Sequence, residues 1–353
     1  MRPASTGSTG RRAGDATGAQ VTAPAGCVTM VVPARDAAAT IGRCLLAALD
    51  VRMQPGSPLA RIILVDDGSR DGTADIAREI GVEVLGGTGR GAGAARNMGW
   101  RAATTDLVWF VDADCVPDPD SLGALLPHLR DARVAGAGGT YGIGPGASLL
   151  QRLIHEEIKV RHARMPESVD FLATFDVLYR RGVLEDLHGF DERYLKGQDA
   201  EFAFRAIEAG HELRFEPRSV VEHHHADRLG RYLRVQRQQG YWRVALHLEH
   251  RGRGRANSYS NALDHARPFV ATAVPLAAMT ALVGTPWWIA ALPLFALLAL
   301  QVPMAVAMSR RAGPAMLAFV PLGAIRDAWR AAGMWHGVVD RVAATWRSWA
   351  RRA

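Results

Sequence analysis

Three acidic residues follow directly on an apolar run in the stretch LVWFVDADCVPDP, residues 107–119. Asp112, Asp114 and Asp118 would gather at the mouth of a buried strand, where like charges repel one another and lose hydration. A positive partner is therefore expected there. Two carboxylates two residues apart can hold Mg²⁺ or Mn²⁺ and leave positions open for water and phosphate. The motif thus suggests a metal ion that neutralises the acidic cluster and bridges it to a diphosphate.

Other polar residues follow other apolar segments in the same way. PARD comes after CVTMVVPA, and DDGSRDGT comes after RIILV. If these segments are parallel strands, their polar ends meet at one edge of the sheet, which is where such sheets bind ligands. The side chains expected to converge on one crevice are Arg35, Asp66, Asp67, Asp112 and Asp114.

The elements that must position these residues follow from the apolar pattern. Segments 27–34, 61–67, 82–85 and 107–114 are predicted strands, and helical patterns lie between them, one of which should end at Gly81. Continuously apolar strands that alternate with helices predict an α/β domain with a mostly parallel central sheet covered on both faces. We expect this domain to extend over residues 27–260.

Bulk composition limits the partners. The 353-residue chain carries a formal charge of +7 and has a sequence pI near 9.8, which favours an anionic partner such as nucleic acid, a phosphorylated small molecule or a membrane surface. Aromatic residues are not interleaved with the arginines as nucleic-acid binding requires, so no nucleic acid is expected. The three cysteines lack CxxC spacing and support neither a disulfide framework nor a zinc site.

The first segment, residues 1–26, is small, polar and aperiodic, and we expect a disordered tail. No apolar run follows its arginine pair, which argues against a signal peptide. A reducing cytosolic environment fits the few cysteines best.

Residues 269–308 contain no charged side chain, and GTPWW near their middle supplies a turn. The length allows two transmembrane helices of ~20 residues each, with a buried core hairpin as the alternative. Arg267 precedes the segment and Arg310 and Arg311 follow it, whereas the central turn has none. The positive-inside rule then predicts a multi-pass protein of the cell membrane with both termini and the catalytic domain in the cytosol.

The last segment, residues 309–353, is predicted to be a basic amphipathic tail on the cytosolic side. Its apolar residues recur at helical spacing among arginines, at Trp335, Val338, Val339, Val342, Trp346 and Trp349. An interfacial helix is expected, and packing against the catalytic domain is the alternative. The arginines between Arg228 and Arg255 are expected to contact anionic headgroups or a lipid phosphate, with a solvated face as the alternative.

A dinucleotide-binding fingerprint is a competing interpretation. Gly87, Gly89 and Ala92 have GxGxxA spacing after a predicted strand, and Asp112 follows about twenty residues later. This would indicate an oxidoreductase. However, the fingerprint normally follows the first strand of its unit, and it leaves DDGS and the second aspartate of DAD unexplained.

Four blocks together resemble the inverting family 2 glycosyltransferases of GT-A fold. They are VVPARD, ILVDDGSRDGT, GAGAARNMGWRAATTDLVWFVDAD and HGFDERYLKGQDAEFAFRAIEAGHELRFEPRSVVEHHH, in the family's order and spacing. The resemblance covers residues Cys27 to His224, and four blocks in order are far more specific than any single motif.

The resemblance implies roles for residues within these blocks. The donor, usually a uridine diphosphate sugar, would be bound by Pro33, Ala34, Arg35, Asp66, Asp67, Asn97, Asp112 and Ala113. Mn²⁺ or Mg²⁺ would be held by Asp114, with Asp112 near the ribose or the metal's water shell and His223 near the metal or the diphosphate. The general base would be Asp199, at the start of a later helix.

The implied reaction is metal-dependent transfer of a sugar, with inversion, to a hydroxyl or lipid-phosphate acceptor at the cytosolic membrane face. Glycan or lipid-linked acceptors of cell-envelope or extracellular glycan synthesis are the expected partners. A non-catalytic membrane scaffold that kept the fold is the main alternative, although such a protein would be expected to lose Asp114 or Asp199, and both are present.

The sequence departs from the family pattern at three places. Gln198 replaces the usual glutamate before the base, and Asp176 stands where asparagine is common. The nearest match to the QxxRW motif of processive members, QRQQGYWR, has the wrong spacing, so one sugar per encounter is expected. Cys115 is interpreted as a small apolar filler, and His224 and His225 as surface groups or neighbours of the site.

Overall fold

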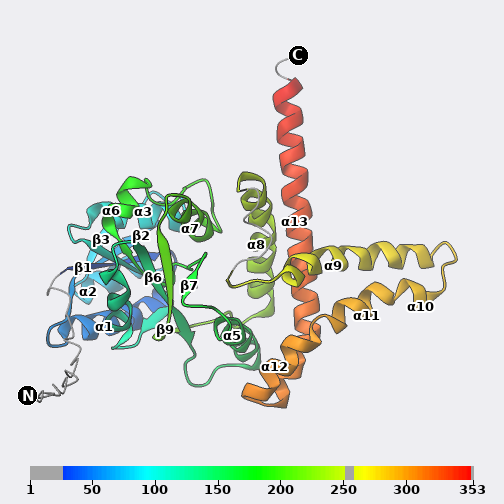
Figure 1. The fold of residues 1–353 in the computed structure, drawn as a ribbon, viewed down its shortest axis with the longest axis horizontal. Coiled ribbons are helices and arrows are strands. Elements are labelled where there is room, and N and C mark those ends of the chain that lie inside the picture. The colour runs from blue at the N-terminus through cyan, green and yellow to red at the C-terminus, as the bar shows by residue number, and fades with distance from the viewer. Residues whose placement is uncertain (1–26, 251–257, 351–353) are drawn as a thin grey trace, which may run out of the picture.

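The computed structural model describes residues 27–250 and 258–350 (Figure 1). The predicted N-terminal tail, the arginines of residues 251–257, residues 351–353 and the side chain of Trp349 lie outside the described part. An α/β domain is followed by a group of long helices.

The first half of the sheet is parallel, as expected. Strands β3, β2, β1 and β4 lie in that order, and all three pairings are parallel. Their bounds are β1 Val28–Ala34, β2 Leu59–Asp66, β3 Glu83–Gly86 and β4 Leu107–Val111, connected by helices α1 Ala38–Met53, α2 Thr73–Glu79 and α3 Ala92–Ala102. The predicted strands are confirmed, and Gly81 has a φ of 83° just after α2, where a helix C-terminus favours glycine.

The second half of the sheet corrects the prediction of a mostly parallel sheet. Strand β8, Asp176–Arg180, runs antiparallel to both β4 and β6, Val134–Gly142, which pairs in parallel with β9, Glu212–His223. The short strands β5, Cys115–Pro117, and β7, Ser168–Val169, pair antiparallel with β9. The sheet is therefore mixed. Apolar periodicity reports burial but not strand direction, which explains the error.

Two apolar cores confirm that both faces of the sheet are covered. Met30 and Trp109 point into one core, whereas their neighbours Val31 and Phe110 point into the other, as strand alternation requires. Helix α3 packs closely against β1, since a Cβ at Gly99 would lie 2.2 Å from Val31 Cγ1. The remaining helices of this domain are α4 Ser121–Leu125, α5 Leu149–His162, α6 Arg181–Asp186 and α7 Gln198–Glu208.

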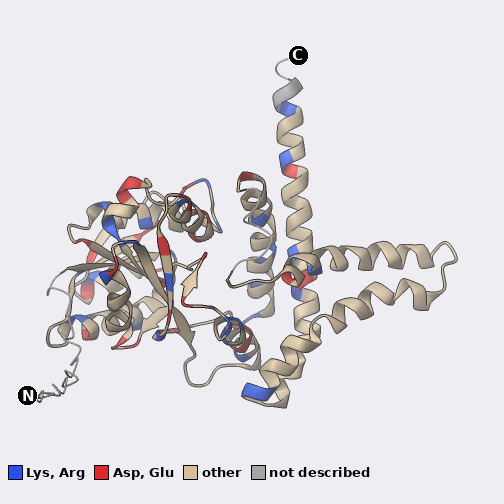
Figure 2. Ribbon diagram, viewed as in Figure 1, with Lys and Arg blue, Asp and Glu red and all other residues tan. Residues whose placement is uncertain are grey.

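Helices of 4 to 32 residues form the C-terminal part. They are α8 Leu229–Glu249, α9 Ala262–Ala281, α10 Trp287–Ala290, α11 Leu292–Ala299, α12 Val302–Ala312 and α13 Phe319–Ala350. Helices α8 and α13 pack side by side, and α9 and α10–α11 project away from the sheet as a hairpin (Figure 1). The turn predicted at GTPWW is present between α9 and α10. Figure 2 shows that the helices of this hairpin, α9 and α10–α11, carry no charged residues except at the start of α9.

Two transmembrane helices were predicted, and the described residues contain one candidate. Among the described helices, the run Trp287–Ala312 is long and apolar enough to cross a membrane by length and composition. The first arm, α9, carries Asp264, His265 and Arg267 in its first two turns and contains prolines. Large apolar side chains near the tip of the hairpin are nonetheless exposed, and Leu282 and Val283 are 85% and 83% accessible. The hairpin is therefore not a buried core element of this chain.

Candidate active site

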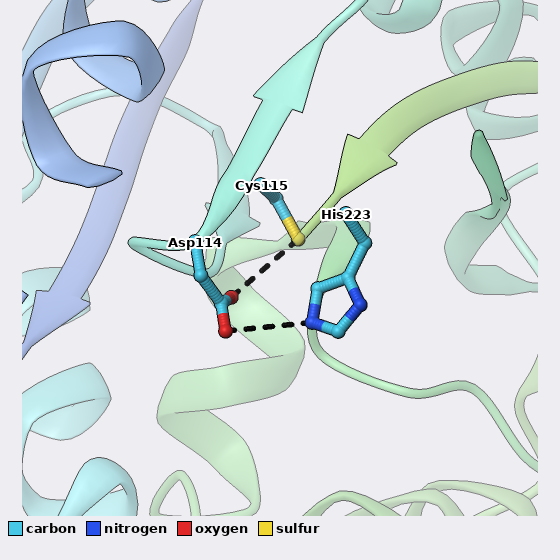
Figure 3. A group of neighbouring side chains, drawn as sticks. All are labelled: Asp114, Cys115 and His223. Atoms are coloured by element: carbon cyan, nitrogen blue, oxygen red, sulfur yellow. Dashed lines mark hydrogen bonds and ion pairs between the residues drawn. The ribbon is translucent and has the colours of Figure 1, made fainter. Parts of the chain in front are cut away.

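Pairing between β5 and β9 brings Asp114 and His223 together. Cys115 lies opposite His223 in the antiparallel register, so Asp114, one residue earlier, faces the imidazole at the end of β9. Asp114 Oδ2 is 3.4 Å from His223 Nε2, and Cys115 Sγ is 3.8 Å from Asp114 Oδ1 (Figure 3). Ligand atoms of the three residues lie within 4.8 Å of one another, which is close enough to share a metal ion.

The protonation states favour Asp114 and His223 as the ligand pair. Burial acts to raise the pKa of Asp114, but the hydrogen bond and charge of His223 outweigh it, so the pKa is lowered and the carboxylate is ionised. Burial raises the pKa of the Cys115 thiol well above its usual value, so it remains a thiol. A carboxylate and an imidazole suit Mn²⁺, whereas a buried neutral thiol fits the filler interpretation of Cys115.

Two further histidines lie behind His223. His225 Nδ1 is 2.7 Å from His223 Nδ1, and His225 Nε2 is 3.4 Å from His155 Nδ1 of α5. Burial lowers the pKa of His225 to about 2 and that of His155 to about 4, so both rings are neutral at pH 7. Since Nδ1 of His223 is engaged, its Nε2 is directed at Asp114, the kind of support that metal-binding histidines receive from neighbouring groups. His224, by contrast, is exposed.

Asp112 is turned away from this pair and contacts an arginine. Asp112 Oδ1 is 2.6 Å from Nη2 of Arg96, whose side chain is 4% exposed. The geometry therefore does not support Asp112 as a metal ligand. A positive partner was expected beside the acidic cluster, and Arg96 is that partner for Asp112. Sequence reasoning missed this residue, although a single charge among the small residues of GAGAARNMG was an available signal.

Arg96 also connects Asp112 electrostatically to Asp199. Asp199 lies in the first turn of α7, after Gly197 with a φ of 85°. Burial raises the pKa of Asp199, and the charge of Asp112 raises it further. The hydrogen bond from the amide of Ala200 and the charge of Arg96 lower it, but the net shift is upward. Nε and Nη1 of Arg96 are buried and have no partner within the described part of the chain. Among the described residues, Arg96 thus pairs with Asp112, acts on Asp199 through its charge, and keeps two donors without a partner.

Gln198 lies next to Asp199 but is buried. Its side chain packs against Gly93 of α3, where a Cβ would be 3.7 Å from Gln198 Cγ, and its Oε1 has no partner among the described residues. The residue that replaces the family's glutamate therefore contacts the start of α3.

The predicted donor residues lie at the ends of β1 and β2. Ala34 pairs with Asp66, and Asp66 Oδ1 accepts a hydrogen bond of 3.1 Å from the amide of Ser69. Pro33 and Ala34 are buried in β1, and Ala113 is buried two residues after the end of β4. Arg35 is exposed, with Nη1 3.4 Å from the carbonyl oxygen of Gly89. These residues therefore lie along one edge of the sheet.

Asp67 fixes the glycine-rich loop. Its side chain is buried and accepts hydrogen bonds from the amides of Gly89 and Gly91, at 2.8 Å and 2.7 Å. Each carboxylate oxygen is engaged. The glycine spacing that suggested a dinucleotide fingerprint thus has another explanation, because two of the loop amides bind Asp67.

Asn97 is not directed toward the crevice. Its Nδ2 donates to the carbonyl oxygen of Phe190 at 2.8 Å, and its Oδ1 accepts from the Phe190 amide and from Nε1 of Trp100, at 2.8 Å and 3.0 Å. The amide is therefore committed to the loop that precedes α7. The prediction that Asn97 binds the donor is not supported by this geometry, and the residue instead positions that loop.

Asp176 lies inside the sheet. It is fully buried, and its carboxylate accepts hydrogen bonds from Nε1 of Trp109 at 2.8 Å and from Oγ of Ser219 at 2.6 Å. Burial raises its pKa to about 6, against the lowering effect of these two bonds. Asp176 therefore does not reach an acceptor, and its role is structural.

Asp176→Asn should increase stability at neutral pH. The folded pKa lies above the ordinary 3.8, so the carboxyl stabilises the fold below about pH 4, and this contribution is lost as pH rises through about 6. Asparagine can keep both hydrogen bonds without a charge. We expect a gain of up to ~3 kcal/mol at pH 7 and almost none at pH 4, measured by urea unfolding. Equal effects at both pH values would contradict this account.

The sequence of the chain is similar to those of known glycosyltransferases. The model of the family described as "Glycosyl transferase family 2" matches residues 29–188. A pre-mycofactocin glycosyltransferase of Mycobacterium tuberculosis is 31% identical over 213 residues, covering 57% of this chain and 43% of that protein. An uncharacterized glycosyltransferase of Mycobacterium bovis is 32% identical over 159 residues, 42% of this chain and 68% of that protein. The chain spans less than half the length of the first relative.

A solved structure of similar fold matches most of the chain. A mannosyltransferase of Pyrobaculum calidifontis, in complex with GDP-Man and Mn²⁺, superposes with a TM-score of 0.59 at 21% identity. The match covers 91% of this chain and 90% of that one. The shared fold therefore extends beyond the sheet into the C-terminal helices.

Proposed function

Because the chain belongs to glycosyl transferase family 2, we propose that it transfers a sugar from a nucleotide diphosphate sugar to an acceptor, with a divalent cation and with inversion. The observation that carries this proposal is the arrangement at the sheet edge. The Asp114–His223 pair lies where β5 pairs with β9, and two residues before Asp114 the carboxylate of Asp112 pairs with Arg96 of α3. The charges of Arg96 and Asp112 both act on Asp199 in the first turn of α7. Metal ligands, a fixed positive charge and a candidate base are the groups that such a transfer needs.

Asp114 and His223 would hold Mn²⁺ or Mg²⁺. When bound, that ion would neutralise the negative charge of the departing diphosphate. The ends of β1 and β2 would bind the nucleotide, with Asp66 and Arg35 exposed enough to contact it. We keep a uridine diphosphate sugar as the proposed donor, and the GDP-Man complex of the structural relative makes guanosine diphosphate sugars the comparison to test.

Asp199 would remove the proton from the acceptor hydroxyl. Its raised pKa makes it a better proton acceptor than an ordinary aspartate, while the charge of Arg96 limits the rise and keeps the ionised form available. The acceptor oxygen would attack the anomeric carbon in line with the leaving diphosphate, which inverts that carbon. This arrangement argues against an inert scaffold, which would not need to keep a carboxylate–imidazole pair together with a buried aspartate of raised pKa. The oxidoreductase alternative loses its basis, because Asp67 binds amides of the glycine-rich loop.

Replacing Arg96 should change the pH dependence of transfer. In Arg96→Gln, Asp199 loses a nearby positive charge, so its pKa should rise and the acid limb of the rate profile should move to higher pH. Arg101→Gln on the exposed face of the same helix is the matched control and should leave the profile unchanged. An unshifted acid limb in folded Arg96→Gln would show that Arg96 does not tune the base.

We also propose that the hairpin of α9 and α10–α11 enters the membrane from the cytosolic side. Exposed apolar side chains line its tip, and Arg310 and Arg311 end α12. At ~1.5 Å per residue, the stretch Phe269–Ala281 of α9 is about 20 Å long, less than the ~30 Å of hydrocarbon. Both ends of the hairpin would then stay on one side. Labelling of single cysteines at positions 260 and 340 from opposite sides of a sealed vesicle would contradict this topology.

Donor hydrolysis tests the proposed activity directly. Purified full-length protein would be incubated with Mn²⁺ and a panel of uridine and guanosine diphosphate sugars, and release of the nucleotide diphosphate would be measured. We expect metal-dependent release from at least one donor. No binding of uridine or guanosine diphosphate with Mn²⁺, in a protein shown to be folded, would refute the proposal.

A further inference from the structure

The start of α7, which carries Asp199, is in contact with the last turn of α8. Leu246 of α8 packs on the glycine that precedes α7, since a Cβ at Gly197 would lie 3.0 Å from Leu246 Cδ1. On the other side of Asp199, Nε2 of His250 at the end of α8 lies 3.9 Å from Oε1 of Glu201. Contacts with α8 therefore flank the proposed base in the sequence of α7.

A buried tyrosine connects the loop before α7 to the same turn of α8. We call residues 190–197, which lead into α7, the base loop. Tyr194 in this loop is 2% exposed, and its hydroxyl donates to Oε2 of Glu249 at 2.7 Å. Its ring also lies 5.6 Å from the ring of Trp242 on α8. Burial and the hydrogen bond to Glu249 raise the pKa of Tyr194, so the hydroxyl keeps its proton at pH 7.

The base loop also contacts the glycine-rich loop that Asp67 fixes. A Cβ at Gly91 would lie 3.2 Å from Leu195 Cδ2, and Arg90 forms an ion pair with Glu192. The base loop is therefore held both by α8 and by a segment at the proposed donor site.

Helix α8 is itself fixed by close packing against α13 (Figure 1). A Cβ at Gly333 of α13 would overlap the carbonyl oxygen of Arg237, and one at Gly240 of α8 would overlap that of Arg330. There is no room for a side chain at either glycine, so the two backbones approach each other directly. The position of the last turn of α8 therefore depends on α13.

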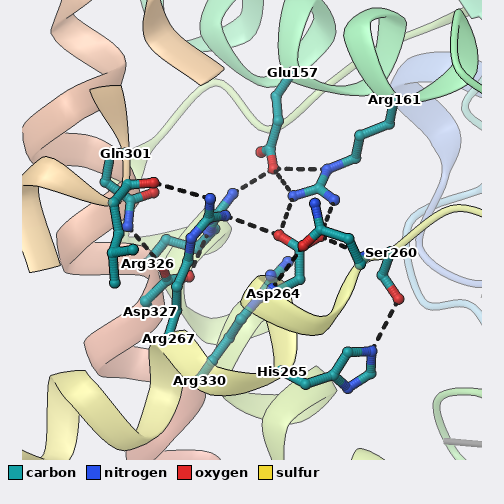
Figure 4. Close-up of polar contacts among 12 residues, drawn as sticks. Glu157, Arg161, Ser260, Asp264, His265, Arg267, Gln301, Arg326, Asp327 and Arg330 are labelled. Atoms are coloured by element: carbon teal, nitrogen blue, oxygen red, sulfur yellow. Dashed lines mark hydrogen bonds and ion pairs between the residues drawn. The ribbon is translucent and has the colours of Figure 1, made fainter. Parts of the chain in front are cut away.

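Buried ion pairs hold the C-terminal helices to α5 of the α/β domain (Figure 4). Nη1 of Arg161 on α5 and Nη1 of Arg267 on α9 lie 2.7 Å and 2.8 Å from the two oxygens of Asp264 on α9. Arg326 of α13 bonds Glu157 of α5, and both side chains are buried. Breaking a buried pair is costly, so these contacts fix α9 and α13 relative to the domain.

We propose that Tyr194 and Glu249 are positioning residues for Asp199, so that the C-terminal helices complete the active site as well as attaching it to a membrane. This inference rests on the proposed sugar transfer and names residues that act through its base. A general base must lie within hydrogen-bond reach of the proton that it removes, and a misplacement of about 1 Å can cost on the order of 10²-fold in rate. A shift of the base loop on α8 would displace Asp199 in this way.

The hydroxyl of Tyr194 distinguishes positioning from packing. A phenylalanine would fill the same volume without the cost of burying a hydroxyl, so the tyrosine is favoured here by its bond to Glu249. The side chain of Glu249 is 45% exposed and also lies 3.7 Å from Arg193, so it is not needed to fill the core. Loss of this hydrogen bond should therefore move the base loop without unfolding the domain.

Tyr194→Phe in the full-length protein tests the proposal, with hydrolysis of the donor found active in the nucleotide sugar panel as the assay. Water is then the acceptor: its oxygen bonds to the anomeric carbon, the diphosphate leaves with the electron pair, and Asp199 takes the proton. We expect kcat to fall by at least ~10-fold, because the base is displaced. Affinity for uridine or guanosine diphosphate with Mn²⁺ should stay at the parent value.

Tyr241→Phe is the matched control for this variant. It removes a tyrosine hydroxyl from α8 itself, where Tyr241 donates to Oδ2 of Asp340 at 3.1 Å, away from the base loop. We expect it to hydrolyse the donor at the parent rate. An equal loss in Tyr194→Phe and Tyr241→Phe would show that α8 had merely loosened.

Two further comparisons show whether Tyr194 acts through Glu249 and Asp199. Glu249→Leu should lower kcat as much as Tyr194→Phe does, and Glu249→Gln, which keeps an accepting oxygen, should restore most of that rate. In the Asp199→Asn background, Tyr194→Phe should cause no further loss, because no base is left to position. A merely structural role would lower the rate in both backgrounds.

The outcomes separate this inference from the proposed function. A parent-like kcat in Tyr194→Phe, a loss confined to donor affinity, or a full additional loss in the Asp199→Asn background would overturn the inference and leave sugar transfer standing. Absence of both donor hydrolysis and nucleotide binding in the folded parent protein would instead refute the proposed function, and the inference with it.

Discussion

Asp199→Asn should lower the rate of sugar transfer by a factor on the order of 10² to 10⁴, the range that general base catalysis contributes. Asparagine keeps the size of the side chain and can still accept from the amide of Ala200, at 2.9 Å in the parent, but it cannot take a proton. The loss should appear in the chemical step. Affinity for the nucleotide diphosphate with Mn²⁺ should change little, since Asp114 and His223 lie on other elements.

Glu208→Gln, at the opposite end of α7, is the control for this variant and should transfer sugar at nearly the parent rate. Rates would be measured against pH, with donor affinity determined separately by calorimetry. Gln198→Glu adds a test from the neighbouring position, because a nearby negative charge should raise the pKa of Asp199 and shift the acid limb upward. If Asp199→Asn transferred sugar at nearly the parent rate, the base would be another residue. That residue would not be Asp176, which is buried inside the sheet.

Asp114→Asn should reduce metal-dependent affinity for the donor by at least ~10²-fold, since it removes the charged member of the ligand pair. The fold should survive, because Asp114 lies at a strand end and its carboxylate makes polar contacts with His223 and Cys115 of the described residues. Calorimetry with uridine or guanosine diphosphate, with and without Mn²⁺, measures the effect. Asp118→Asn, an exposed acid four residues later, is the matched control.

The same variant distinguishes two sources of donor affinity. Arg96 and the ends of β1 and β2 remain intact in Asp114→Asn, so weak binding without metal should persist. If the variant keeps its full Mn²⁺-dependent affinity, the metal is held by other residues, and the Asp114–His223 pair has no part in binding it.

The parallel half of the fold could be predicted because buried parallel strands are continuously apolar, as in β1, β2 and β4. The reversed direction of β8 could not, because Asp176–Arg180 is equally apolar whichever way it runs. The same limit applies to the hairpin. Apolar composition predicted two helices and the turn between them, but it does not report how far each helix extends into a membrane.

Site residues in a motif at the end of a strand could be predicted from the sequence. Site residues on a helix could not, because their contacts depend on how the helix packs. The motif and the family resemblance pointed to Asp114 and His223, and the β5–β9 register brings them together. Arg96 was missed because an arginine on a short helix ordinarily faces solvent, and only the packing of α3 on β1 directs it to Asp112. Asn97, its neighbour, faces the loop before α7 for the same reason, because consecutive helical residues point in different directions.

The buried ion pairs that join α5 to α9 and α13 have a consequence for how this chain can diverge. Removing one partner of a buried ion pair costs about 3 to 5 kcal/mol, a large part of the 5 to 15 kcal/mol that stabilises a typical domain. A change at Glu157 alone would remove one carboxylate partner from Arg161 and from Arg326, and a change at Asp264 alone would remove one from Arg161 and from Arg267. In related sequences we therefore expect these positions to be replaced together or not at all, so that the joint between domain and hairpin is inherited as a single unit.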